Sequence, residues 1–276
     1  MSEKDVVVVV VGNGIMNISN DYCLKTKIRR QNSPLFPDNV RGLIIGKSNC
    51  GKTTLLFNLL LRPGWLDYNR LYVFGKSLHQ PEYKIIKNGF EDGLSKRQIS
   101  NIFTQQDVLS KANVSPLDAI DEYNGIKEGG IVANFYNDCA MIPDPTSLDA
   151  TEKNLLILDD CFLGKQSKAE AYYSRGRHNN CDTIYISQNY FRLPRQTIRE
   201  NSNFIILFPQ DAKNLTHIYA DHCSQDISLG EFKNLCKDVW KLRHNLITID
   251  LTSSSMNGKY RKNLDCFYLP DTIGKY

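Results

Sequence analysis

The sequence contains no apolar run long enough to cross a membrane. A bilayer-spanning helix needs about 20 consecutive apolar residues, whereas the most hydrophobic stretch, Val6–Val11, has only six. Valine favours extended structure, so we expect this stretch to form a β-strand that needs a pairing neighbour. A signal-peptide pattern is also missing, and we therefore expect an intracellular protein without a membrane span.

Paired cysteine motifs are missing as well. None of the cysteines are spaced as C-x-x-C, which argues against a zinc ribbon or a thioredoxin-like redox site. Thiols of intracellular proteins are kept reduced. We therefore expect free thiols at every cysteine, namely Cys23, Cys50, Cys139, Cys161, Cys181, Cys223, Cys236 and Cys266.

The chain carries little net charge and no internal repeat. A net charge of +4 at pH 7 permits a basic patch for nucleic acid but does not require one. Charged residues make up 23% of the 276 residues and hydrophobic residues 41%, which excludes a mainly disordered chain. This length suits one large α/β domain with a modest appendage.

From Val40 onward, short apolar runs alternate with helical patterns, which predicts a mainly parallel sheet covered by helices on both faces. Residues 1–39 are expected to form an N-terminal strand and a basic arm, and residues 40–276 the folded domain. The predicted strands are Leu43–Ile45, Leu71–Phe74, Leu155–Leu158, Thr183–Ser187 and Phe204–Phe208. The predicted helices are Lys52–Leu61, Lys168–Arg175, Asp211–Asp221 and Leu229–Trp240.

Three further segments have weaker patterns. In the arm, Lys25, Lys27, Arg29 and Arg30 are expected to be solvated. The stretch Gly75–Thr151 is long for a simple connection, so we expect helices and one or two inserted strands there. At the C-terminus, Leu246–Leu251 is predicted to pair with Leu264–Leu269 in a hairpin around a turn at Asn257-Gly258.

The segment Gly46–Thr53 fits the pattern G-x-x-x-x-G-K-[ST] of a phosphate-binding loop. An apolar strand precedes it and an apolar helix follows, so backbone N–H groups and the positive helix end would face the phosphates. Lys52 would contact the β- and γ-phosphates, and the Thr53 hydroxyl would bind Mg²⁺. ATP and Mg²⁺ are therefore the predicted cofactors. The predicted nucleotide contacts are Gly46, Lys47, Ser48, Asn49, Cys50, Gly51, Lys52, Thr53 and Thr54.

Two acids end the apolar run Leu155–Leu158. Ligands of open α/β sheets bind at the carboxyl ends of the strands. We therefore predict that Asp159 holds Mg²⁺, together with Thr53, and that Asp160 orients or deprotonates the attacking water.

A polar side chain, Gln188, directly follows the next predicted strand, Thr183–Ser187. An amide at this point can sense the γ-phosphate or align water. A strand that ends in a polar side chain and follows the acidic strand in the sequence is expected to lie between the acidic strand and the phosphate-loop strand. That arrangement is typical of ring motors rather than of GTPases or nucleotide kinases.

Several arginines flank the Gln188 strand. An arginine offers a rigid, permanently charged group for developing phosphate charge, and it can act from a neighbouring subunit. Arg177 is the preferred candidate for such a finger, with Arg175 and Arg199 as the alternatives. Arg192 and Arg195 flank a proline in a loop and are candidates for contact with a DNA backbone.

The combination of motifs resembles that of the poxvirus-type genome-packaging ATPases, a viral branch of the FtsK–HerA superfamily within the ASCE P-loop NTPases. The most telling pieces are Asp159-Asp160, Gly176-Arg177-His178, and Gln188 followed by Arg199-Glu200-Asn201. The resemblance covers Val40–Leu251 and is thin over Gly75–Thr151. Asp160 is a departure, because many such motors carry glutamate there.

This resemblance implies a P-loop ATPase domain with the strand order 5-1-4-3-2. It also implies an ATP-driven motor that translocates double-stranded DNA into a capsid as a homo-oligomeric ring, a pentamer or hexamer. Lys52, Asp160, Gln188 and Arg177 would be its catalytic residues. Capsid proteins are a further candidate partner, and the viral assembly site of a host cell or the virion is the expected location.

Three alternative functions stay open. A cellular FtsK–HerA-type DNA translocase shares the chemistry and differs in its partner. A P-loop small-molecule kinase would use Gly75–Thr151 as its acceptor lid, although kinases seldom need paired acids followed by a polar strand. A nucleotide-dependent scaffold would have no role in DNA movement. DNA-stimulated ATP turnover separates the two translocases from the other two.

Overall fold

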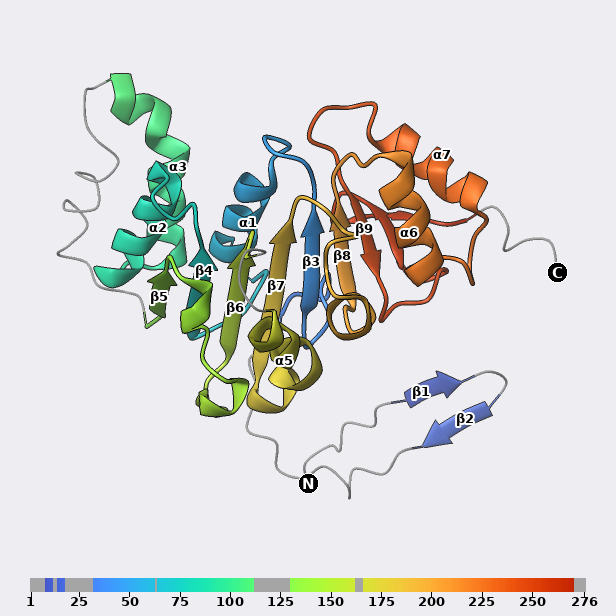
Figure 1. Ribbon diagram of the computed structural model, residues 1–276, viewed down its shortest axis with the longest axis horizontal. Helices are drawn as coiled ribbons and strands as arrows, with labels where there is room; N and C mark the ends of the chain where they lie inside the picture. Colours follow the sequence, from blue (N-terminus) through green and yellow to red (C-terminus); the bar gives the residue numbers. More distant parts are fainter. Residues whose placement is uncertain are drawn as a thin grey trace, which may run out of the picture. The chain divides into compact units, whose positions relative to one another are not determined.

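The computed structural model describes residues 8–11, 14–17, 32–62, 64–111, 130–161 and 166–270 (Figure 1). The chain divides into two compact units, Met1–Arg30 and Gln31–Tyr276. In the first unit, β1 (Val8–Val11) pairs antiparallel with β2 (Gly14–Asn17). This confirms the expected pairing of the valine run. The basic residues Lys25, Lys27, Arg29 and Arg30 lie outside the described residues.

A single nine-stranded sheet runs through the second unit, in the order β11-β10-β9-β8-β3-β7-β6-β4-β5. The strands are β3 (Arg41–Ile45), β4 (Arg70–Gly75), β5 (Val132–Tyr136), β6 (Asn154–Asp159), β7 (Cys181–Ser187), β8 (Phe204–Leu207), β9 (Ile247–Asp250), β10 (Tyr260–Lys262) and β11 (Cys266–Tyr268). From β8 to β5 all neighbouring strands are parallel. Counting β3 as the first strand and β4, β6, β7 and β8 as the next four gives 5-1-4-3-2, so the predicted order is confirmed.

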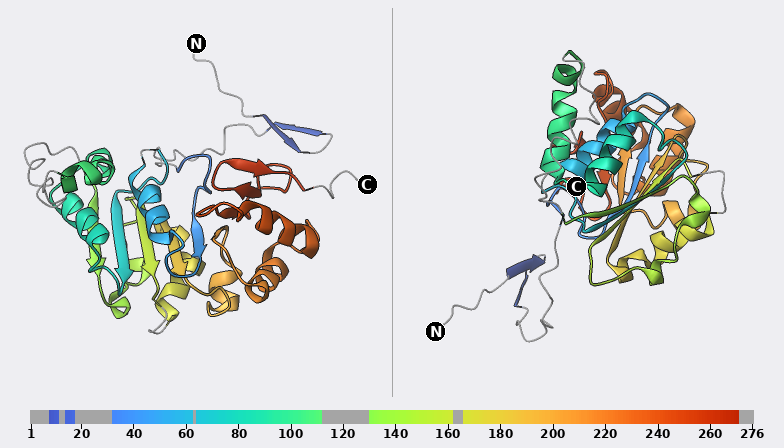
Figure 2. Two further views of the ribbon diagram at one scale, coloured as in Figure 1. Left: turned by 90° about the horizontal axis from the view of Figure 1, so that it is seen from above. Right: turned by 90° about the vertical axis from the view of Figure 1, so that its left-hand side faces the viewer.

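Helices cover both faces of this sheet (Figure 2). They are α1 (Lys52–Leu61), α2 (Pro81–Glu91), α3 (Lys96–Lys111), α5 (Ser167–Arg175), α6 (Ala212–His222) and α7 (Leu229–Val239). Strand side chains alternate between faces. Accordingly, Ile44 of β3 joins the core under α1, α2 and α3, while its neighbours Leu43 and Ile45 join the core under α5, α6 and α7. Within the described part of the chain, no helix is long and apolar enough to span a bilayer.

A buried carboxylate, Asp182, lies near the amino end of β7 and binds the segments around it. It accepts hydrogen bonds from the Lys153 ammonium at 2.9 Å, the Val40 amide at 3.0 Å and the Asn32 side chain at 2.7 Å. A buried charge is tolerated only when it is paired and hydrogen-bonded. These contacts attach the segment from Asn32 to Val40 to the sheet.

The C-terminal pairing differs from the prediction. The Asn257-Gly258 turn is present, with Gly258 at φ 86°, but the strand paired with β9 is β10, not Leu264–Leu269. The predicted partner region contains β11, which pairs with β10 instead. A three-residue strand is too short to show an alternating pattern in the sequence. In addition, one buried position of β10 is occupied by a charged residue, Arg261, which pairs with Asp250 at 2.6 Å.

Candidate nucleotide-binding site

The predicted phosphate-binding loop connects the carboxyl end of β3 to α1, which begins at Lys52. The backbone turns through left-handed conformations at Asn49 (φ 60°) and Gly51 (φ 107°), a region that glycine and asparagine enter most easily. Gly46 has no room for a side chain, since a Cβ there would lie 2.5 Å from the Cys50 sulfur and 2.8 Å from Phe208 Cβ. The loop is thus a close-packed cradle at a helix N-terminus, the geometry that binds phosphate through backbone N–H groups.

Lys52 holds its ammonium group over this loop. Its Nζ donates to the Lys47 carbonyl oxygen at 2.7 Å. An ammonium group has three donors, so two stay available for phosphate oxygens without breaking this bond.

The acidic pair lies at the carboxyl end of β6, two strands away from the loop. Asp159 is half-buried, and its Oδ2 accepts a hydrogen bond from the Tyr83 hydroxyl at 2.7 Å. Burial raises the pKa of Asp159; Asp160 adds to this, whereas the Tyr83 bond and Lys52 oppose it. Asp160 itself has φ 53°, a left-handed backbone conformation that ends the extended strand after Asp159.

The amide of Gln188 joins the loop to the acidic pair. Its Oε1 accepts from the Ser48 hydroxyl at 3.1 Å, and its Nε2 donates to Asp160 Oδ2 at 3.0 Å. This bridge is possible because β7 lies between β3 and β6. The structure thus places Gln188 between the loop and the acids, as predicted, and brings Ser48 and Asp160 into one hydrogen-bonded chain.

A cleft of about 940 Å³ opens beside the loop. Five of the nine predicted nucleotide contacts line it: Asn49, Gly51, Lys52, Thr53 and Thr54. The start of α2 and part of α3 also line it. Such a volume is typical of small-molecule sites.

His244 also lines this cleft, and the sequence patterns did not indicate it. It lies in the turn between α7 and β9 with φ 66°, and its Nδ1 is 3.3 Å from the Cys50 carbonyl oxygen. A non-glycine residue in the left-handed region costs free energy and is frequent at functional sites. No motif surrounds this histidine, so only the folded chain reveals it.

The oxygen ligands at the site fit Mg²⁺. Within the described ranges, no group of three or more His, Cys, Asp or Glu side chains is arranged to hold a metal. Mg²⁺ does not need one, because it is commonly held by one or two carboxylates together with substrate phosphates and water. The Thr53 hydroxyl on the cleft wall and the Asp159 carboxylate are hard oxygen donors of this kind.

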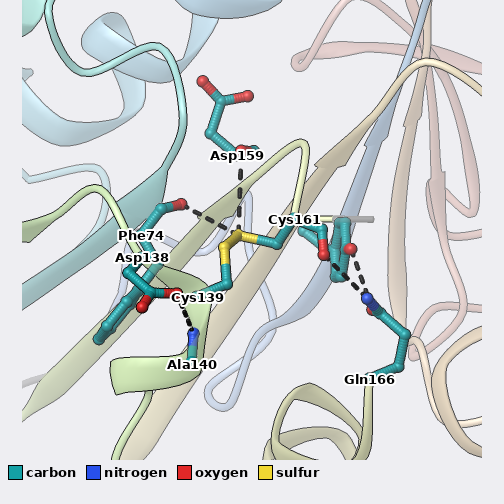
Figure 3. Close-up of a disulfide and its surroundings, with 8 residues drawn as sticks. Phe74, Asp138, Cys139, Ala140, Asp159, Cys161 and Gln166 are labelled. Atoms are coloured by element: carbon teal, nitrogen blue, oxygen red, sulfur yellow. Dashed lines mark hydrogen bonds between the residues drawn. A yellow bond between two sulfur atoms is a disulfide. The ribbon is translucent and has the colours of Figure 1, made fainter. Parts of the chain in front are cut away.

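A disulfide joins Cys139 and Cys161 next to Asp159 at the end of β6 (Figure 3). The Cα atoms are 6.1 Å apart, and Cys161 Sγ lies 3.4 Å from the Phe74 carbonyl oxygen. The expectation of free thiols is therefore wrong for this pair. The chain after β5 returns across the end of β6, and this brings together two cysteines that are 22 residues apart in the sequence.

Arg177 lies at the edge of the sheet opposite to the phosphate loop. It is exposed in the short helix Gly176–Asn179, just before β7. Burial and the nearby charge of Arg177 lower the pKa of Arg41, the first residue of β3. Arg175 is exposed too, 3.7 Å from Asp144. Both arginines are therefore far from the loop of their own chain.

Arg199, an alternative finger, is held by contacts within its own chain. Its side chain is only 7% exposed and pairs with Asp221 at 3.2 Å. It also stacks on Tyr190, with 5.0 Å from the guanidinium carbon to the ring centre. The Arg199 guanidinium is thus buried between Asp221 of α6 and the Tyr190 ring. By contrast, Arg192 and Arg195 are exposed.

The fold is similar to that of solved nucleoside triphosphatases. The genome-packaging NTPase B204 from Sulfolobus turreted icosahedral virus 2, in complex with AMPPCP, matches with a TM-score of 0.48 and 14% identity, over 82% of this chain and 97% of that chain. The DNA-packaging ATPase B204 from Sulfolobus turreted icosahedral virus matches with a TM-score of 0.43 and 16% identity, over 82% and 97%. VirB4 of Thermoanaerobacter pseudethanolicus matches with 0.43 and 12% identity, over 87% and 91%.

Comparisons at the level of sequence find no relative. No protein-family model matches the chain, and no curated protein does. The structural similarities concern the fold alone. The pairing of the strands defines a mixed α/β architecture with a mainly parallel sheet flanked by helices.

Proposed function

We propose that this chain is an ATP-driven motor that translocates double-stranded viral DNA into a capsid, working as a ring of identical subunits. The observation that carries the proposal is the Ser48–Gln188–Asp160 chain of hydrogen bonds. It couples the phosphate loop to the acid that would activate water. A change at the γ-phosphate would therefore alter the hydrogen bonds of the loop after β7, and a hydrolysis-driven motor requires such coupling.

The residues divide the chemistry among them. Lys52 supplies charge to the β- and γ-phosphates, and Thr53 and Asp159 would hold Mg²⁺, which when bound neutralises developing phosphate charge. Asp160 would orient the water and accept its proton. A small-molecule kinase has no need of such a water-activating pair, so the bridge through Gln188 favours a hydrolase.

Arg177 is proposed to act on the neighbouring subunit. Its exposure and its place at the far edge of the sheet support a role across a subunit interface. Arg177→Ala and Lys52→Ala are each expected to be nearly inactive alone. In mixed rings, some interfaces pair an intact loop with an intact arginine, and partial ATP turnover should return. Rings shown to be mixed but without any rescue would point to Arg175 or to no finger at all.

The deciding experiment measures ATP turnover with and without double-stranded DNA. The expected result is a stimulation that disappears in Lys52→Ala and that requires duplex longer than the ring is thick. Turnover indifferent to DNA would favour a kinase or a scaffold. Nuclease protection of DNA that depends on added empty capsids then separates a packaging motor from a cellular translocase.

A further inference from the structure

A buried phenol stands behind the predicted Mg²⁺ ligand. Tyr83 of α2 is 1% exposed, and its hydroxyl donates to Asp159 Oδ2 at 2.7 Å. The ring packs edge-on against Phe57 of α1, with 5.2 Å between ring centres. Tyr83 therefore belongs to the apolar core on one side and to the nucleotide site on the other.

The hydroxyl is a committed donor. A buried hydroxyl costs free energy unless it is hydrogen-bonded, and a carboxylate partner makes the bond a strong, charge-assisted one. The Tyr83 hydroxyl is therefore the donor of this bond and the Asp159 carboxylate its acceptor.

Asp159 is constrained from a second side by backbone packing. Asp159 pairs with Gly75 in the ladder between β6 and β4, and a Cβ at Gly75 would lie 3.1 Å from the Asp159 Cβ and 3.1 Å from its carbonyl oxygen, so the backbone of the two strands is closely packed here. Tyr83 then fixes the remaining rotation, that of the carboxylate group. A carboxylate has two oxygens with about four lone-pair sites, and the single bond from Tyr83 leaves Oδ1 for a metal ion or its water.

We propose that Tyr83 is a positioning residue, which orients the Asp159 carboxylate to receive the divalent cation of a metal–nucleotide complex. The inference rests on the proposed function, because it requires this cleft to bind nucleotide with a metal. Groups that orient metal ligands from behind typically change metal affinity or activity about 10–100-fold when they are removed. The helix that carries Tyr83 begins beside the cleft, where Gln80, Pro81 and Glu82 form part of the wall.

The matched pair of variants is Tyr83→Phe and Tyr68→Phe. Tyr68 is 0% exposed in the same apolar core, and its hydroxyl donates to the Leu60 carbonyl oxygen at 2.8 Å, away from the acids. Each change removes one buried hydroxyl and keeps the ring. A loss of thermal stability common to both variants is thus the effect of removing a buried hydrogen bond, whereas an effect on metal binding confined to Tyr83→Phe is specific to the site.

The measurement is the binding of Mn²⁺, followed by electron paramagnetic resonance, to the full chain in the presence of a non-hydrolysable ATP analogue. We expect Mn²⁺ affinity to fall about tenfold in Tyr83→Phe and to stay within twofold of the wild type in Tyr68→Phe. Affinity for the analogue without a divalent cation should not change in either variant, because the phosphate loop is untouched.

Two results overturn the inference. Unchanged Mn²⁺ affinity in Tyr83→Phe would mean that the hydroxyl serves packing alone, and tighter binding would mean that it competes with the metal. Failure of the proposed function is distinguishable from both, because then the wild-type protein itself would show no Mn²⁺ binding that depends on the analogue.

Discussion

Asp160→Asn is expected to leave nucleotide binding nearly unchanged and to slow ATP hydrolysis by about 10²–10⁴-fold, because an amide cannot accept a proton from the attacking water. At about 1.36 kcal/mol for each factor of ten, this corresponds to about 3–5 kcal/mol of activation free energy. The carboxylate is in place for the reaction, since the Gln188 amide holds its Oδ2 at 3.0 Å.

The backbone conformation at Asp160 determines which substitution tests its role as proton acceptor without other changes. Asp160 has φ 53°, a left-handed conformation that costs most L-residues about 1–2 kcal/mol but that asparagine tolerates. Asparagine can also accept the bond from Gln188 through its side-chain oxygen. Asp160→Ala would add backbone strain and break the bridge, so a slow alanine variant would not identify the lost base.

The assay pairs steady-state ATP turnover with equilibrium binding of a fluorescent nucleotide, with and without Mg²⁺. Asp159→Asn is the matched control: it should lose the part of nucleotide affinity that depends on Mg²⁺. Turnover of Asp160→Asn within a few-fold of the wild type would refute the assignment of the base. Loss of Mg²⁺-dependent affinity in Asp160→Asn instead would move the metal role from Asp159 to its neighbour.

Three other perturbations have defined outcomes. Lys52→Ala should abolish ATP turnover with an unchanged circular dichroism melt, because this side chain is only partly buried and contributes charge rather than packing; a melt lowered by several degrees would contradict this. Gly46→Ala should weaken nucleotide binding by at least about tenfold, because the new Cβ would lie 2.8 Å from Phe208 Cβ and the loop must shift. Burial lowers the pKa of His222 to about 4, below the unfolded value of about 6.5. The unfolded chain therefore binds the extra proton first, and the free energy of unfolding should fall by about 3 kcal/mol as pH drops from 6.5 to 4. Urea titrations should show a smaller fall in His222→Gln, and an equal fall would reject the assignment to this histidine.

The parallel strands and the phosphate loop were predictable because their signals are local. A strand buried on both faces must be apolar along its length, and a ligand site at its end must be polar. The run Leu155–Leu158 followed by Asp159 satisfies both conditions within a few residues. The position of the Gln188 strand between the other two followed from its polar end, whereas the full order 5-1-4-3-2 was implied by the family resemblance.

Contacts between distant segments that no sequence motif marks were not predictable. Tyr83 is 76 residues from Asp159, and His244 is 194 residues from Cys50. A tyrosine on an apolar helical face is indistinguishable from an ordinary core residue until its partner is known. The Cys139–Cys161 disulfide was missed for the same reason, because the path of the chain after β5 decides which cysteines meet.

The arginines show how such long-range contacts bear on mechanism. The sequence offers Arg177 as the preferred finger and Arg199 as an alternative. In the structure a partner on α6, Asp221, holds Arg199 in the core, whereas Arg177 is exposed. Arg177 is near Arg41, at the start of β3, and the loop follows the other end of that strand. A five-residue strand with about 3.3 Å per residue separates the two edges by at least about 13 Å. That distance exceeds the reach of an arginine side chain directed along the sheet surface. If Arg177 takes part in hydrolysis, it must therefore do so on the phosphates of another subunit, so its catalytic role and ring formation stand or fall together.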